Sequence, residues 1–158
     1  MTTINEWLVD QLLRSAEGDA WHGPSVREAL DGVSVEEASA HPIPGAHSIR
    51  ELVLHLAAGF RLVLRRLDGD GSPLTVEEDW PVPSDATEEA WRQEVASLFA
   101  LNRRVREAVA TFPVARLDQP LVPHPPYSAF TQFIGLTQHD LYHAGQIMLL
   151  RRALGHGR

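Results

Sequence analysis

The chain has 158 residues and a formal net charge of −7, from 14 Arg, no Lys and 21 acidic residues, and it contains 8 His and no Cys. This composition excludes disulfide bonds, thiolate metal sites, a cysteine nucleophile and a lysine Schiff base. The acidic balance argues against nucleic-acid binding, which needs a basic surface. No apolar run reaches the roughly 18 residues of a membrane span, and the N-terminus lacks the features of a signal peptide. We therefore expect one cytoplasmic domain over residues 1–158, with no nucleic-acid or membrane partner.

Four long segments repeat apolar residues at three- and four-residue steps, the period of an amphipathic helix. In chain order, we predict long helices over about 4–18, 48–67, 87–112 and 128–154, with two short helices after Ser25 and Ser34. A Ser or Thr followed three residues later by Glu, as at Thr3 and Ser48, is typical of a helix start. The last long helix is apolar around much of its circumference, which points to a partner surface as well as to a core.

The connections are long and rich in Pro and Gly. A loop of about 16 residues that contains Trp80 joins the second long helix to the third, and loops of this length are often functional. The segment 113–127 contains too much proline for a helix. No segment alternates with a period of two, so the pattern predicts an all-α four-helix bundle with long crossover connections.

His139 and His143 lie four residues apart in the segment QHDLYHAGQ of the last long helix. Their side chains therefore share one face of the helix, one turn apart, together with Gln146. With this spacing, a single helix can offer two imidazoles to one metal ion. The alternative is two histidines that are hydrogen-bonded separately, one of them on the surface.

His55 is the candidate for a third ligand, in the apolar run RELVLHLAAG of the second long helix. A single histidine in such a run is also compatible with a core residue that is bonded to a backbone carbonyl. If the second and fourth long helices face each other, three histidines leave open coordination positions, as catalytic zinc sites do. Among the remaining histidines, His22 is the best further candidate.

Three segments together resemble the DinB-like superfamily, which includes the bacillithiol-transferase and mycothiol-dependent maleylpyruvate isomerase branches. They are PIPGAHSIRELVLHLA, EEDWP and QHDLYHAGQIMLLRRALG. The resemblance implies a four-helix bundle that is often dimeric. It also implies a divalent metal ion bound by one histidine of the second long helix and two of the fourth, which here are His55, His139 and His143. Characterised members transfer low-molecular-weight thiols to electrophiles or isomerise thiol adducts, and no motif assigns this chain to a branch.

We therefore expect a metal-dependent transferase that uses a low-molecular-weight thiol and a small-molecule substrate, and that forms a homodimer. Zinc or nickel fits three histidines and an open position best, with iron, cobalt or manganese as alternatives. The metal ion would activate a thiolate or a water molecule. The competing hypotheses are a metal-binding stress-response or sensing module without turnover, and a metal-dependent hydrolase of small substrates.

Further residues are candidates for supporting roles, whereas no catalytic residue can be assigned from the sequence. Gln146 and Asp140 are placed to orient the imidazoles, although Asp140 could also face solvent. Trp80 and Tyr142 are candidates for a pocket wall, with core packing as their other role. In a hydrolase, Asp140 would occupy the position of the catalytic Glu of the HExxH motif, one methylene group shorter.

Overall fold

The structure, a computed structural model, describes residues 2–83 and 85–155. Its four long helices are α1 (Ile4–Glu17), α4 (Ile49–Leu67), α6 (Glu88–Ala110) and α7 (Ala129–Ala153). Shorter elements lie between them: α2 (Val26–Leu30), α3 (Val35–Ser39), α5 (Val76–Asp79) and the 3₁₀ turn η1 (Val114–Arg116). The described residues form no strand beyond one isolated bridge between Pro120 and Ser128. The predicted all-α four-helix bundle is confirmed.

Side-chain caps fix where the helices begin. The capping-box geometry is present at five starts, where a Ser or Thr side chain accepts a hydrogen bond from the backbone N–H of a Glu three residues later, and the Glu carboxylate accepts one from the backbone N–H of the Ser or Thr. One of these starts, at Thr75, opens the short helix α5 inside the predicted Trp80 loop. The sequence prediction missed α5 because a helix of four residues is too short to show an apolar period.

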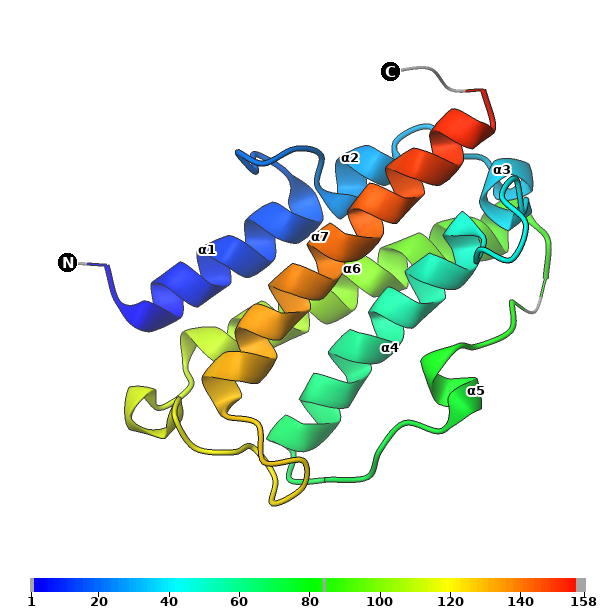
Figure 1. The fold of residues 1–158 in the computed structure, drawn as a ribbon. Helices are drawn as coiled ribbons and strands as arrows, with labels where there is room; N and C mark the ends of the chain where they lie inside the picture. The colour runs from blue at the N-terminus through cyan, green and yellow to red at the C-terminus, as the bar shows by residue number, and fades with distance from the viewer. Residues whose placement is uncertain (1, 84, 156–158) are drawn as a thin grey trace.

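The four long helices form a ring in which each contacts two others, in the order α1, α6, α4, α7. The Nδ2 atom of Asn5 donates to the carbonyl oxygen of Phe112, which places the start of α1 beside the end of α6. Arg66, at the end of α4, bonds Gln132, at the start of α7. Helices α4 and α7 are therefore antiparallel neighbours, and Figure 1 shows α1 and α7 running one way and α4 and α6 the other.

The parallel arrangement of α4 and α6 demands a connection that travels the length of the bundle. This crossover passes outside α4 and carries α5 against it (Figure 1). The apolar core lies inside the ring, and its fully buried members include Leu12, Val53, Leu56, Val105, Phe133 and Ile147.

Helix α7 exposes apolar side chains on its outer face as well as burying others. Phe130, Tyr142 and Leu149 are 39%, 65% and 56% exposed. The partner surface and the homodimer stay predictions. Among the described residues, no helix combines the length and the apolar character that crossing a membrane requires.

One buried ion pair joins the starts of α4 and α6. The guanidinium of Arg50, whose side chain is 2% exposed, donates through Nε and Nη2 to the two carboxylate oxygens of Glu94 at 2.7 and 2.6 Å. The pairing with Glu94 raises the pKa of Arg50 above its ordinary value. Removing one partner of a buried pair leaves the other charge without compensation.

Glu94→Ala should therefore lower the free energy of unfolding, measured by urea denaturation, by about 3 kcal/mol. Asp10→Ala is the matched control because it breaks the exposed pair between Asp10 and Arg14, and the unfolding midpoint should hardly move. Equal effects of the two substitutions would contradict a stabilising role of the Arg50–Glu94 pair.

Candidate metal centre

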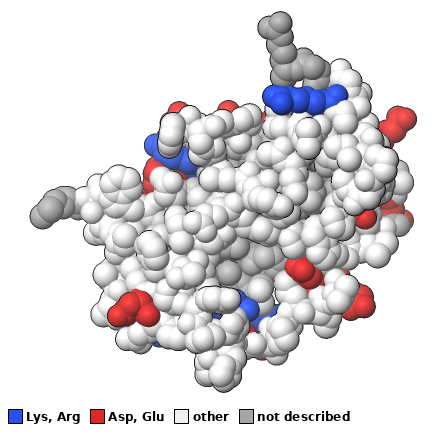
Figure 2. Space-filling view, in the orientation of Figure 1, with Lys and Arg blue, Asp and Glu red and all other residues white. Residues whose placement is uncertain are grey.

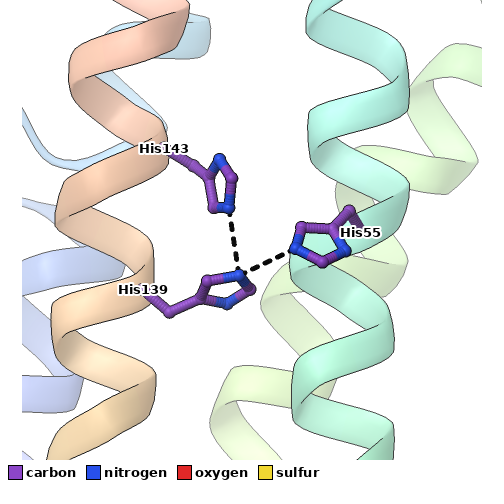
Figure 3. A group of neighbouring side chains, drawn as sticks. All are labelled: His55, His139 and His143. Atoms are coloured by element: carbon purple, nitrogen blue, oxygen red, sulfur yellow. Dashed lines mark hydrogen bonds between the residues drawn. The ribbon is translucent and has the colours of Figure 1, made fainter. Parts of the chain in front are cut away.

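Three histidines meet between α4 and α7. His55 extends from α4, and His139 and His143 extend from successive turns of α7 (Figure 3). The Nε2 atom of His139 lies 3.0 Å from the Nε2 atom of His55 and 3.0 Å from that of His143. One ring nitrogen of each histidine lies within 4.8 Å of the other two. The structure thus brings together the three residues that the sequence singled out.

The crossover between α4 and α6 anchors the outer side of the His55 ring. The Nδ1 atom of His55 is 2.9 Å from the backbone oxygen of Asp79 and 3.1 Å from its Oδ1 atom. Because a carbonyl oxygen can only accept, Nδ1 carries the proton, and the lone pair of Nε2 points toward the other two histidines. Trp80 stacks on His55 with ring centroids 4.0 Å apart, and His47 stacks on the opposite face of Trp80 at 3.7 Å.

Gln146 anchors His143 in the same way. Its Oε1 atom lies 2.6 Å from Nδ1 of His143, so the Nδ1–H group donates outward and the Nε2 lone pair faces the cluster. The ring of Tyr142 meets the His143 ring edge-on, with 5.0 Å between centroids. The side chain of Tyr142 is nevertheless largely exposed.

The His139 ring lies against Gly59 of α4. A Cβ atom at position 59 would come within 3.2 Å of Nδ1 of His139 and 3.4 Å of its Cε1. The absence of a side chain at this position therefore makes room for the ring. Burial lowers the pKa of His139 to about 4, and burial also lowers the pKa of His143. Both imidazoles are neutral at pH 7, the form that binds metal ions.

The donor set fits a divalent cation better than it fits hydrogen bonds alone. The Nε2 atoms of His55 and His143 both present lone pairs to Nε2 of His139, which has at most one proton to donate. One of the two lone pairs is therefore left without a proton. A cation bound by all three nitrogens would satisfy them together, and two nitrogens bound tetrahedrally to one zinc ion are about 3.3 Å apart.

Two other predicted residues, Asp140 and His22, lie away from this cluster. Asp140 faces neither the histidines nor solvent: it is 1% exposed and accepts a hydrogen bond from the Ser15 hydroxyl of α1 at 2.9 Å. It lies one position after His139, about 100° further around the helix. Burial raises the pKa of Asp140 to about 8. His22 is exposed and lines a small hollow beside Thr137, so it is not part of the three-histidine group.

Sequence reasoning missed Asp79, His47 and Gly59. The hydrogen bond from His55 goes to the backbone oxygen of Asp79, which no residue type reveals, and His47 reaches the site by stacking on Trp80. Gly59 was on the stripe of His55, but its contact with His139 depends on how closely the two helices approach.

A cavity of about 320 Å³ lies beside the cluster. Its lining includes Gln146, which bonds His143, and His47, which stacks on Trp80. The rest of its wall is mainly apolar and comes from the loop before α4 and from both helices: Ile43, Gly45, Ala46, Leu52, Leu149 and Leu150.

Comparisons with known proteins agree with the fold. The sequence model of the DinB superfamily matches residues 20–147. The crystal structure of a conserved protein from Enterococcus faecalis superposes with a TM-score of 0.72 at 19% sequence identity, over 98% of this chain and 99% of that one. At this identity the likeness concerns the fold alone. No curated protein matches the chain.

Gly59→Ala should weaken the binding of Co²⁺ severalfold, because the new methyl group displaces the His139 ring by a few tenths of an ångström. The helix itself should gain stability, by roughly 1 kcal/mol, so unfolding would not explain the loss. Gly135→Ala in α7 is the control, since a Cβ atom there meets nothing within 4 Å among the described residues. The affinity of each variant for Co²⁺ is measured by titration followed by cobalt absorbance. Equal affinities of Gly59→Ala and Gly135→Ala would show that the His139 ring tolerates the methyl group.

Proposed function

The chain belongs to the DinB superfamily, and on this premise we propose that it is a metal-dependent transferase that joins a low-molecular-weight thiol to a small electrophile. One observation carries the proposal: three imidazoles point their Nε2 atoms at one another while acceptors hold two of the rings from behind. Such a set leaves coordination positions open for a substrate.

His55, His139 and His143 would hold the metal ion. When bound by neutral ligands, a divalent ion keeps its full charge and lowers the pKa of a thiol or water molecule beside it, which yields a nucleophile at neutral pH. Zinc or nickel suits the donor set best, and iron, cobalt or manganese are alternatives.

The chain's own residues orient and shield this chemistry. Asp79 and Gln146 fix the tautomers of His55 and His143, and Trp80 covers one face of the His55 ring. Because the chain has no Cys, a thiol nucleophile must come from a cosubstrate. The cavity of about 320 Å³ beside Gln146 has the size and the apolar wall to take the body of a small electrophile.

The hydrolase is a weaker candidate than the transferase. In that hypothesis Asp140 takes the place of the catalytic Glu in an HExxH motif, yet its carboxyl group is buried against Ser15 of α1. The second candidate is a metal-binding stress-response or sensing module without turnover, which the same three histidines would serve. A cytoplasmic location and a homodimer belong to the proposal as well.

The double substitution of His139 and His143 by Ala should abolish tight binding of Zn²⁺ and Ni²⁺, because one imidazole cannot hold the ion. His55→Ala should weaken binding by at least about tenfold. His22→Ala is the matched control, since this exposed histidine lies outside the cluster. Isothermal titration gives the affinities, circular dichroism checks the helices, and full retention of metal by the double variant would refute the site.

The transferase hypothesis predicts that the metal-loaded protein consumes a model electrophile only when a thiol is present. Glutathione, bacillithiol and mycothiol are to be compared with monobromobimane as the electrophile, and thiol loss is followed by fluorescence. The His139/His143 double variant should fall to the uncatalysed rate. If every thiol and every metal leaves the rate at background while the metal binds tightly, the module without turnover is the better description.

A further inference from the structure

Arg66, at the end of α4, is a half-buried cation without an acidic partner. Its Nη1 atom donates to the neutral Oε1 atom of Gln132 at 2.8 Å. Its Nε atom is buried and has no hydrogen-bond partner. Within the described residues, no carboxylate lies within ion-pair distance of this guanidinium, and burial lowers the pKa of Arg66. A buried charge with unused donors is costly unless something pairs with it.

Two other arginines that bridge helices have a carboxylate partner. Arg50 has Glu94, and Arg106 donates to Glu17 at 2.5 Å. Arg151 also has a buried Nε atom without a partner, but it donates to the backbone oxygen of Ala29 at the α2 side of the bundle. Arg66 differs from all three because it lies in the contact between α4 and α7, the same contact that holds the histidines.

Helix geometry places Arg66 in line with the three-histidine cluster. Arg66 follows His55 by 11 positions, which is three turns with an angular offset of only about 20°. Gln132 precedes His139 by seven positions, two turns along the facing side of α7, again with an offset of about 20°. The spacing along the helix axes is therefore about 10 Å on α7 and about 16 Å on α4.

The surface between α4 and α7 is hollowed. Figure 2 shows a depression between the middle of α7 and the C-terminal half of α4, with basic atoms at its lower edge, acidic atoms to its right and uncharged residues elsewhere around it. Gly59, which has no side chain, lies on the α4 stripe between His55 and Arg66.

Gln132 is fixed in a way that orients the guanidinium. Its Nε2 atom donates to the backbone oxygen of Tyr127 at 3.0 Å, which leaves Oε1 for Arg66. An amide positions the guanidinium without neutralising its charge, so the cation stays available to an anion.

We propose that Arg66 binds the anionic group of an elongated substrate whose thiol end lies at the three-histidine cluster. This inference rests on the proposed function and adds to it a substrate class: a thiol with a carboxylate or similar anion about 10 Å from the sulfur. The Nη2 atom of Arg66 makes no hydrogen bond within the described residues and is not among the buried atoms, so it can donate to a carboxylate oxygen.

The test compares 8-mercaptooctanoic acid with 8-mercaptooctanol, which differ only in the charge at the end remote from the sulfur. Their affinities for the Co²⁺-loaded protein are read from the absorption band between cobalt and thiolate. The acid should bind about tenfold more tightly than the alcohol, the effect of a charged hydrogen bond. Equal affinities in the wild type would overturn the proposal without any variant.

Arg66→Gln should abolish the preference for the acid, and Arg66→Lys, which keeps the charge, should retain part of it. Arg65→Gln is the matched control: it removes one charge from the same turn, but from an arginine already paired with Glu78 at 2.7 Å. The preference should survive in this control. If Arg65→Gln removes the preference as fully as Arg66→Gln does, the effect comes from overall charge and the proposal is wrong.

A second measurement separates this inference from the metal chemistry. In the metal-free protein, the ¹⁵N signal of the Arg66 Nε–H group should shift on titration with octanoate and not with octanol. Failure to bind cobalt would contradict the proposed function, yet the shift would still support an anion site at Arg66. No shift with octanoate, whatever the metal does, would overturn it.

Discussion

The candidate site depends on one contact, the antiparallel packing of α4 against α7, with three imidazole rings between the two helices. Taking these rings out of water disfavours their charged forms, so His139 and His143 are neutral at pH 7 and their lone pairs are available. The same burial makes every ring nitrogen need a partner. The backbone of Asp79 and the side chain of Gln146 meet this need on the outer side, and their effect is to direct the remaining lone pairs inward.

The polar groups of the bundle divide between two kinds of interface. Most of those that join α6 to its neighbours are matched: Arg50 meets Glu94, and the amide of Asn102 donates to the backbone oxygen of Leu12, whereas Oδ1 of Asn5 is buried without a partner. Those between α4 and α7 are unmatched, with converging lone pairs at one point and an arginine without a carboxylate further along. Matched groups add stability, whereas unmatched ones keep their capacity to bind something else. We infer that stability and chemistry reside in different pairs of helices.

The sequence predicted the fold and the pair of His139 and His143 because both have short-range signatures, whereas the resemblance to the DinB-like superfamily singled out His55 as the third ligand. Apolar periodicity and capping residues located the long helices, and the spacing of His139 and His143 placed both on one face. The residues behind the ligands could not be found this way. Asp79 uses a backbone oxygen, and Gly59 matters only because α7 approaches closely. Asp140 was predicted to lie beside the histidines or in solvent. It is instead buried against α1, where the Ser15 hydroxyl donates a hydrogen bond to it.

The direction of α6 determines which segment of the chain holds His55. Because α6 runs parallel to α4, the chain must return along the outside of the bundle, and that return segment brings Asp79 and Trp80 onto His55. The segment packs on the surface and contributes little to the apolar core. We therefore expect changes in the length or sequence of this segment to leave the packing of the long helices intact. Changes near Asp79 and Trp80 would alter how His55 is held. A substitution at Asp79 or Trp80 would therefore change the surroundings of His55 more than the packing of the four long helices.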